Sequence, residues 1–244
     1  MKTLFAAVMT LPLLLGAADL YLAGDSTMCD YAEKFAPMQG WGTALKSLVK
    51  PDVNVINLAR GGRSSKSFLA EKGRWDKILA DGKPGDFVII QFGHNDAHKG
   101  EKNRYRFTNP DDTYRYYLKI YIAEARAKGM IPVLCTQTAL CRFRPDGSVL
   151  DREPAEYIVA CREVAKETGC DFVDLNAYAR EQLAAMGQQK AIKLYMTLAE
   201  GEFPNYPQGR RDRCHLRAEG AEFYAKGFVE LARKQKLPIA EIFK

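Results

Sequence analysis

The feature that most constrains the fold is an apolar segment that ends abruptly at a Gly-Asp-Ser sequence. Residues 20–23 read Leu-Tyr-Leu-Ala, a run typical of a buried strand, and Gly24, Asp25 and Ser26 follow directly. Ligands of open α/β sheets bind at the carboxyl ends of the strands, so the Ser26 hydroxyl is expected at the binding edge. Because a serine hydroxyl is a poor nucleophile without a neighbouring base, the rest of the chain has to supply one.

Four further apolar runs predict the other strands of one sheet. They cover residues 53–58, 87–92, 131–136 and 172–175. Several are continuous rather than alternating, as expected for parallel strands covered on both faces. Helical patterns lie between and after them, at residues 40–49, 67–79, 112–128, 153–168, 177–198 and 218–236. This alternation predicts an α/β fold, a flavodoxin-like doubly wound five-stranded parallel sheet with helices on both faces.

The N-terminal composition predicts a cleavable leader before one domain. Residues 1–18 combine Lys2, an apolar stretch and small residues at the end, a pattern typical of a signal peptide. A membrane anchor or a buried first helix is the alternative, but the apolar stretch is shorter than the roughly 20 residues that span a bilayer, and Pro12 interrupts it. We expect residues 19–244 to form a single domain that is secreted or periplasmic, with no membrane insertion after the leader is removed.

The charge of the chain favours acidic partners only moderately. The formal net charge is +6 at pH 7, which permits attraction to acidic polymers such as uronic-acid polysaccharides. Nucleic acid is the other acidic partner, but the sequence contains no nucleic-acid-binding motif. We therefore expect an acidic polysaccharide rather than nucleic acid, with a plain basic surface as the alternative.

The six cysteines form no CxxC or zinc-ligand pattern, and we expect no metal and no cofactor. Cys135 falls in a predicted strand, where it is expected to be a small core residue. Cys29 and Cys214 each lie within three residues of a candidate catalytic residue. A disulfide between them is one hypothesis for an exported chain, and free or otherwise paired thiols are the alternative.

Two further strand ends carry potential hydrogen-bond donors. Gly61 and Gly62 follow the second predicted strand, and Gly93, His94 and Asn95 follow the third. Glycine lets a backbone N–H approach a ligand closely, and the Asn95 amide can point into the crevice. With the backbone N–H of Ser26, Gly62 and Asn95 offer three donors from adjacent strand ends, which acyl transfer needs to hold its oxyanion. Each group alone is also explained by a tight turn or a cap.

Only three histidines are available as a base. His215 has Asp212 three residues before it, and we expect the pair to lie one helical turn apart just before the C-terminal helix. A carboxylate there would orient the imidazole and stabilise its protonated form. We expect His94 to pack or hydrogen-bond beside the site, where it is also a candidate for contacting substrate, and His98 to be a loop residue.

Several residues near the predicted crevice are candidates for contacting substrate. Arg60, Arg63 and Lys66 follow the second strand and could pair with uronate carboxylates, although for Arg63 a structural brace of the loop is the interpretation we favour. Trp41 either packs beneath the Ser26 loop, the interpretation we favour, or stacks on a sugar. The insertions 100–111 and 142–152, the second with a Pro-Asp-Gly turn that suggests a hairpin, either shape a cleft or are solvated loops.

These blocks resemble those of the SGNH (GDSL) hydrolase superfamily. The four blocks are Gly24-Asp25-Ser26, Gly62, Gly93-x-Asn95 and Asp212-x-x-His215. The chain is more closely similar to the rhamnogalacturonan acetylesterase group, carbohydrate esterase family twelve. This second resemblance rests on the sequences GDSTM (24–28), GWG (40–42), GGRSSKSF (61–68), QFGHND (91–96) and NYPQG (205–209). It covers nearly all of the chain after residue 18.

The resemblance implies the SGNH hydrolase fold and a metal-independent serine esterase that removes O-acetyl groups from plant cell-wall polysaccharide, in the first place rhamnogalacturonan (pectin), through an acetyl-serine intermediate. It implies Ser26 as nucleophile, His215 as base and Asp212 as its orienting carboxylate, with Ser26, Gly62 and Asn95 as the oxyanion hole. In one departure, Arg213-Cys214 stands where the group usually has Asn-Thr, which bears on substrate preference more than on chemistry.

Three other functions are alternatives to a polysaccharide acetylesterase acting on rhamnogalacturonan. An SGNH lipase or thioesterase would need a long apolar lining, whereas the loops after the strand ends are charged and aromatic. An acetylxylan esterase would share the chemistry and differ in polymer. A non-catalytic polysaccharide-binding protein is expected to have lost a triad residue, and none is lost. The charged residues of the loops are Lys99, Lys102, Arg104, Arg106, Arg142 and Arg144.

Overall fold

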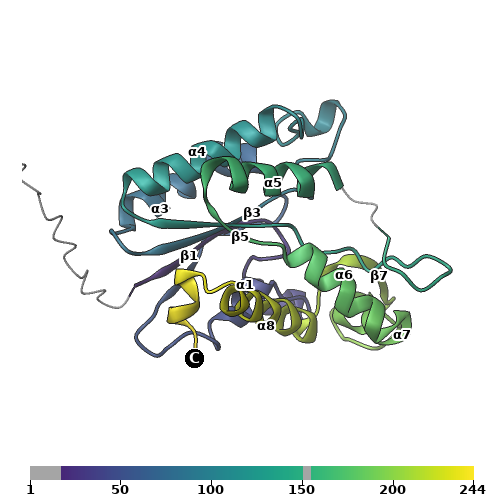
Figure 1. Cartoon of the computed structure of the whole chain (residues 1–244). Coiled ribbons are helices and arrows are strands. Elements are labelled where there is room, and N and C mark those ends of the chain that lie inside the picture. The colour runs from purple at the N-terminus through teal and green to yellow at the C-terminus, as the bar shows by residue number, and fades with distance from the viewer. Residues whose placement is uncertain (1–17, 151–154) are drawn as a thin grey trace, which may run out of the picture.

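A five-stranded parallel sheet organises residues 18–150 and 155–244, which the computed structural model describes (Figure 1). The strand order is β2-β1-β3-β4-β5, which confirms the predicted flavodoxin-like order. The strands are β1 (Leu20–Gly24), β2 (Val55–Asn57), β3 (Phe87–Gln91), β4 (Ile131–Cys135) and β5 (Asp171–Val173). The predicted leader, apart from Ala18, lies outside the described residues.

The sheet order brings the ends of the first three strands together. β1 pairs with β2 on one side and with β3 on the other, and Gly24 lies opposite Gln91. All residues of β1 and β3 are buried, as expected for central strands with helices on both faces. The segments that follow β1, β2 and β3 therefore leave the sheet side by side, and these segments carry Ser26, Gly62 and Asn95.

Helices cover both faces of the sheet, as predicted (Figure 1). One layer packs against Leu20 and Leu22 of β1, and the other packs against Tyr21 and Ala23, because successive strand side chains point to opposite faces. The first layer contains α1 (Trp41–Leu45), α6 (Leu175–Met186) and α8 (Ala218–Lys234). The second contains α2 (Ser65–Ala70), α3 (Trp75–Asp81), α4 (Thr113–Ala127) and α5 (Ala155–Thr168).

The helix predicted across residues 67–79 is two helices in the structure. The Ser64 hydroxyl caps α2 by accepting a hydrogen bond from the Ser67 backbone N–H. The Ser67 hydroxyl oxygen in turn accepts one from the Ser64 backbone N–H. The break between α2 and α3 contains Gly73, whose φ of +80° is a conformation that favours glycine. Short helices complete the fold: α7 (Gln188–Ala191), η1 (Glu33–Phe35), η2 (Glu101–Asn103), η3 (Ile192–Leu194) and η4 (Pro238–Ile242).

A two-stranded antiparallel sheet near the C-terminus was not predicted. It consists of β6 (Tyr195–Leu198) and β7 (Arg210–Leu216). The expected helix to residue 198, and the expected helical spacing of Asp212 and His215, are therefore wrong. Polar and charged residues dominate β7 because most of it is exposed or half-buried, so it lacks the apolar run by which a buried strand is recognised.

The insertion at residues 142–152 turns back on itself, as its Pro-Asp-Gly sequence suggested. Phe143 lies opposite Val149 in an isolated bridge, and Gly147 adopts a φ of +82° at the turn. The described part of the insertion ends at residue 150.

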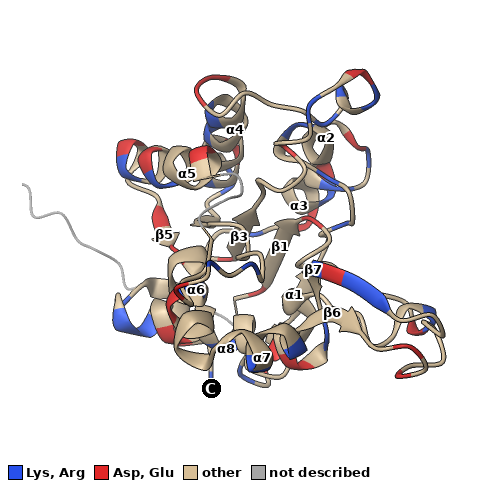
Figure 2. Cartoon of the chain, turned by 90° about the vertical axis from the view of Figure 1, so that its right-hand side faces the viewer, with Lys and Arg blue, Asp and Glu red and all other residues tan. Residues whose placement is uncertain are grey.

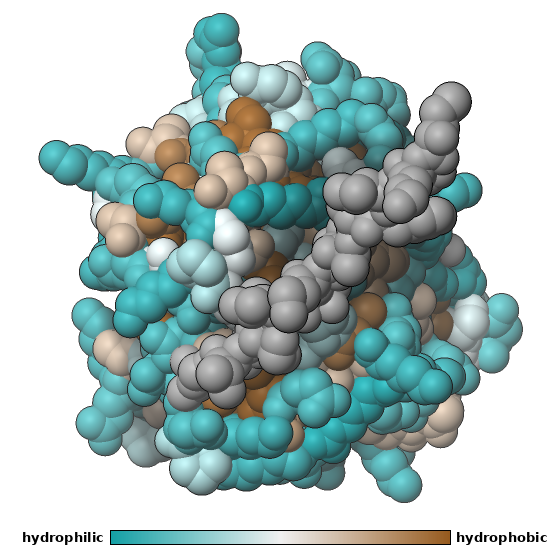
Figure 3. Space-filling model, turned by 60° about the vertical axis from the view of Figure 1, so that its left-hand side comes forward, coloured by the Kyte–Doolittle hydropathy of each residue, from teal (hydrophilic) through white to brown (hydrophobic). Residues whose placement is uncertain are grey.

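Hydrophilic side chains predominate on the face seen in Figure 3, with hydrophobic ones in small areas between them. Among the described residues, no helix combines the length and apolar character needed to cross a membrane.

Gly40, the N-cap residue of α1, packs closely against the main chain that follows Ser26. A Cβ atom at this position would lie 2.2 Å from the Cys29 carbonyl oxygen and 2.4 Å from the Met28 carbonyl carbon. Gly40→Ala must therefore displace backbone, and we expect the free energy of unfolding to fall by about 3 kcal/mol. In Gly61→Ala, the matched control, the new Cβ would meet only Ser26 Cβ, at 3.6 Å. Equal stability of the two variants in urea unfolding would contradict this packing argument.

Candidate active site

Ser26 lies in a tight turn directly after β1. The Asp25 carboxylate accepts hydrogen bonds from the backbone N–H and the hydroxyl of Thr27, both at 2.8 Å. The Tyr31 hydroxyl donates to the Ser26 carbonyl oxygen at 2.8 Å. These bonds fix the turn on both sides of Ser26, and the Ser26 side chain lines a cavity.

Asp212 and His215 come together in a bulge of β7. Regular pairing is interrupted between Tyr195, which lies opposite Leu216, and Thr197, which lies opposite Arg211. Extra residues on one strand of a pair bend it and redirect its side chains. The Asp212 carboxylate stabilises this bend, because its Oδ1 accepts the backbone N–H groups of Cys214 and His215, both at 3.0 Å.

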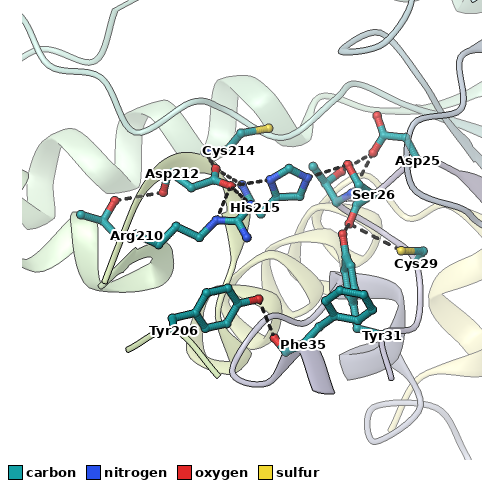
Figure 4. Close-up of polar contacts among 12 residues, drawn as sticks. Asp25, Ser26, Cys29, Tyr31, Phe35, Tyr206, Arg210, Asp212, Cys214 and His215 are labelled. Carbon is teal, nitrogen blue, oxygen red and sulfur yellow. Dashed lines mark hydrogen bonds and ion pairs between the residues drawn. The ribbon is translucent and has the colours of Figure 1, made fainter. Parts of the chain in front are cut away.

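The two segments meet in a Ser-His-Asp hydrogen-bond chain (Figure 4). His215 Nε2 lies 3.0 Å from Ser26 Oγ, and His215 Nδ1 lies 2.7 Å from Asp212 Oδ2. This is the arrangement by which an imidazole takes a proton from a serine while a carboxylate holds its tautomer. The structure therefore brings together all three residues predicted as a triad.

Arg210 is a fourth group in this chain, and it was not among the residues predicted from the sequence. Its guanidinium donates to Asp212 Oδ2 through Nε at 3.1 Å and Nη2 at 2.7 Å, and it lies over the Tyr206 ring at 5.5 Å. Alternation of strand side chains, which places residues 210 and 212 on the same face, would have suggested the pair if β7 had been recognised as a strand.

The Asp212 carboxyl is ionised over a wide pH range. Its burial alone favours the neutral form, but hydrogen bonds and charge from His215, together with the backbone N–H groups of His215 and Cys214, outweigh that effect. They hold the pKa of Asp212 well below its usual value of 3.8. Asp212 can therefore orient His215 at neutral pH without accepting its proton.

Two backbone N–H groups are available beside Ser26 Oγ. Gly62 has a φ of +79°, a conformation that favours glycine, and both Ser26 and Gly62 line the cavity. In the described part of the chain, neither of their N–H groups donates to a protein acceptor. Both remain free to donate to a ligand oxygen.

The Asn95 amide is held at both of its ends. Asn95 Nδ2 donates to the Arg63 carbonyl oxygen at 3.0 Å, and Arg106 Nη1 donates to Asn95 Oδ1 at 3.0 Å. A guanidinium can only donate and a carbonyl oxygen can only accept, so these partners permit a single orientation of the amide. One Nδ2 hydrogen is used by Arg63, and the second is left for the cavity that Asn95 lines.

The cavity at Ser26 has a volume of about 810 Å³. Three arginines reach it, Arg106, Arg142 and Arg210, and none of the described residues that line it is an aspartate or a glutamate. The other lining residues are Ser26, Tyr31, Phe35, Met38, Gly61, Gly62, His94, Asn95, Ala97, His98, Leu140, Cys214 and His215. The positive lining suits a ligand with negative charge.

The structure places the predicted substrate contacts differently. His94 lines the cavity and lies 3.2 Å from the Thr138 hydroxyl, and His98, expected to be a loop residue, lines it as well. Arg63 braces its loop, bonded to Glu71 and to the Gly61 carbonyl oxygen, and it lines a neighbouring hollow rather than the Ser26 cavity. Lys66 donates to the Arg104 carbonyl oxygen on the surface. Arg63 and Lys66 are therefore corrected to residues outside the cavity.

Trp41 packs rather than facing a sugar. Its side chain is fully buried, stacks on Phe228 with ring centroids 5.5 Å apart, and donates from Nε1 to Gln91 Oε1 at 2.9 Å. A ring enclosed in this way offers no face to a ligand, so its candidacy for substrate binding is withdrawn.

All six cysteines lie in the described part of the chain and none forms a disulfide, so the Cys29–Cys214 pairing is not formed. The Cys29 thiol is buried against the Ser26 carbonyl oxygen at 3.7 Å, and burial raises its pKa to about 11. In Figure 4 the two sulfur atoms lie on opposite sides of the Ser26–His215 contact. Proximity along the sequence to a shared site therefore did not bring the thiols together. Cys135 is a buried core residue, as predicted.

Comparison with known proteins identifies the family. The sequence matches the GDSL-like lipase/acylhydrolase family over residues 22–223. The chain belongs to this family. It is therefore a carboxylic ester hydrolase, and its GDSL block is the Gly24-Asp25-Ser26 turn described above.

Two curated relatives of this GDSL protein are rhamnogalacturonan acetylesterases. The chain is 35% identical to RhgT of Bacillus subtilis, over 91% of this chain and 92% of RhgT. It is 28% identical to a rhamnogalacturonan acetylesterase of Emericella nidulans, over 88% of this chain and 84% of the relative.

Solved structures show the same fold. The protein YXIM of Bacillus subtilis has a TM-score of 0.77 at 24% identity, with 91% of this chain and 58% of that longer chain covered. A catalytic mutant of the acetylxylan esterase Axe2 of Geobacillus stearothermophilus has a TM-score of 0.60 at 20% identity, with 88% and 94% covered.

The lowered pKa of Asp212 makes a prediction about acid stability. The folded form binds fewer protons at this carboxyl than the unfolded form, so the stabilisation is present above about pH 4 and is lost as pH falls further. We expect Asp212→Asn to lower the free energy of unfolding by on the order of 2 kcal/mol at pH 7. Relative to wild type, this deficit should shrink between pH 4 and pH 2.

The control is Asp111→Asn. The Asp111 carboxylate is exposed and, among the described residues, takes part in no hydrogen bond or ion pair. Urea unfolding of the three proteins across this pH range makes the measurement. A deficit of Asp212→Asn that stays constant with pH would contradict the assignment.

Proposed function

We propose that the enzyme removes O-acetyl groups from acetylated, acidic plant cell-wall polysaccharide, with rhamnogalacturonan as the first candidate substrate. The single observation that carries this proposal is the Ser26–His215–Asp212 chain opening into a cavity whose charged lining residues are arginines. The relatives named for rhamnogalacturonan acetylesterase activity match along nearly the full chain, which supports the same substrate class.

The proposed reaction has two halves. His215 Nε2 takes the proton of Ser26 Oγ as that oxygen attacks the acetyl carbonyl carbon, and the N–H groups of Ser26, Gly62 and Asn95 Nδ2 hold the oxyanion. His215 then gives the proton to the departing sugar oxygen, which leaves acetyl-Ser26. Water, deprotonated by His215 in the same way, attacks this ester, and acetate leaves as Ser26 Oγ recovers its proton.

The cavity disfavours two alternative substrates. A long fatty acyl chain needs an uninterrupted apolar surface, whereas three arginines interrupt the apolar lining that residues such as Phe35, Met38 and Leu140 supply. Acetylated xylan has no charge on its backbone sugars, so it offers no anionic partner to Arg106 and Arg142, whereas Arg210 already pairs with Asp212.

We also propose that the enzyme works outside the cytoplasm as a single catalytic domain, residues 19–244, after removal of residues 1–18. A polymeric cell-wall substrate is found outside the cell, and the N-terminal composition is that of a signal peptide. N-terminal sequencing of the protein recovered from the medium or periplasm tests this, and retention of residues 1–18 there would contradict it.

Ser26→Ala removes the proposed nucleophile. We expect acetate release to fall by on the order of 10⁶-fold while the protein stays folded, because the Ser26 backbone contacts do not depend on the hydroxyl. Acetylated rhamnogalacturonan, acetylated xylan and a long-chain acyl ester are assayed in parallel. Ser47→Ala is the matched control, because Ser47 is exposed and its hydroxyl donates to the Ala44 carbonyl oxygen, away from the cavity.

The outcomes separate chemistry from substrate. Full activity of Ser26→Ala would overturn the mechanism. Wild-type release from xylan alone would retain the mechanism and replace the polymer, and turnover of the long-chain ester alone would exclude the carbohydrate substrate.

Arg106 is a positioning residue for the proposed oxyanion hole. Asn95→Ala should lower kcat about 10²- to 10³-fold. Arg106→Gln should lower it about tenfold, because a charge-assisted bond that fixes the amide is lost. The uncharged substrate 4-nitrophenyl acetate is used, so that loss of a positive charge does not itself change binding.

The control for Arg106 is Arg104→Gln on the same loop. Arg104 is exposed, and its guanidinium pairs with the carboxylate of Glu101. A rise in KM with unchanged kcat in Arg106→Gln would show that Arg106 binds substrate and does not position Asn95.

A further inference from the structure

A second hollow opens beside the Ser26 cavity. Its volume is about 350 Å³, and it shares Leu140, Arg142, Arg210 and Cys214 with the larger cavity. Its remaining lining residues, Arg211, Asp212 and Arg213, belong to β7. The hollow therefore adjoins the catalytic cavity along the strand that carries His215.

The lining of this side hollow is strongly basic. Four of its seven residues are arginines, and Figure 2 shows β7 as a basic strand interrupted by one acidic residue. That residue is Asp212, whose two oxygens already accept hydrogen bonds from the backbone N–H groups of Cys214 and His215, from the imidazole and from Arg210. Asp212 is thus committed to the triad and does not neutralise Arg211 and Arg213, which are exposed.

The size and chemistry of the side hollow match one acidic sugar. Small-molecule sites begin at about 300 Å³, so a single pyranose ring fits. Guanidinium groups pair with carboxylates through two parallel hydrogen bonds and remain charged at all relevant pH values. Cys214 lines both hollows and precedes His215 directly, so a ring held here lies next to the ester under attack.

We propose that the side hollow is a subsite for the carboxylate of a uronic acid residue, held by Arg211 and Arg213, at or next to the acetylated sugar. This deepens the proposed function and rests on it for the identity of the polymer. The subsite would select for an acidic backbone, because a neutral chain leaves these arginines hydrated and contributes nothing there.

Binding to the inactive Ser26→Ala protein tests the subsite without any turnover. The probes are trigalacturonate and its methyl ester, which keeps the sugar rings and removes the charge. We expect trigalacturonate to bind at least about tenfold more tightly in calorimetric titrations at low salt, the scale of one charge-assisted hydrogen bond. The preference should diminish as salt screens the charges. Equal binding of the two probes would overturn the proposal.

A matched pair of double variants locates the effect. Arg211→Gln with Arg213→Gln, made in the Ser26→Ala protein, should abolish the preference for the free acid. Lys50→Gln with Lys128→Gln removes the same charge from two exposed residues that precede β2 and β4, and so lie near the amino ends of the strands, opposite the catalytic site. This control should retain the preference. The proposal would be overturned if the arginine double variant still preferred trigalacturonate over its methyl ester. It would also be overturned if the lysine double variant lost this preference to the same extent.

Failure of the subsite is distinguishable from failure of the proposed function. Acetate release by the wild-type enzyme from acetylated rhamnogalacturonan reports on the function, whereas the titrations use probes without acetyl groups. An enzyme that deacetylates the polymer but binds both probes equally would retain the function and exclude the subsite. An enzyme that prefers the free acid but releases no acetate would retain the subsite and exclude the function.

Discussion

The Asp212 carboxylate is the interaction on which the site depends. It accepts two backbone N–H groups, an imidazole N–H and a guanidinium, so one side chain bends β7, fixes the tautomer of His215 and pairs with Arg210. Its burial would favour the neutral acid without these donors, and with them the anion is retained. Local backbone shape and acid–base chemistry are therefore set by the same group, and neither can change without the other.

On the opposite side of the Ser26–His215 contact, the serine depends on a buried polar network. The Gln91 side chain accepts from Trp41 Nε1 and donates to the Thr136 carbonyl oxygen, and its Oε1 lies 3.3 Å from the Thr27 hydroxyl that donates to Asp25. Buried polar groups are costly unless every partner is present. The network thus links the Ser26 turn to α1, to the end of β3 and to the end of β4. The close approach of Gly40 completes this support from α1.

Much of the fold followed from local sequence, because five apolar runs and the helices between them leave few arrangements of a parallel sheet. The strand ends that carry Ser26, Gly62 and Asn95 were predicted for the same reason. The β6–β7 hairpin was missed, since β7 is polar on both faces and its conformation depends on Asp212 and on pairing with β6. Lys66 was misplaced because sequence proximity to a strand end does not reveal side-chain direction, whereas the packing of Trp41 and the bracing role of Arg63 are the interpretations that the sequence favoured. Arg210 and the Arg106–Asn95 contact depend on tertiary placement.

Ser26 and His215 are separated by 189 positions along the chain. The serine turn needs only β1 and its neighbours, whereas the imidazole arrives with a hairpin formed near the C-terminus. Contacts between residues so far apart in sequence require closure of a long loop, which lowers the conformational entropy of the intervening chain. A partly assembled sheet would thus present a serine without a base. Esterase activity is therefore a property of the completed domain, and its appearance reports that the chain has finished folding.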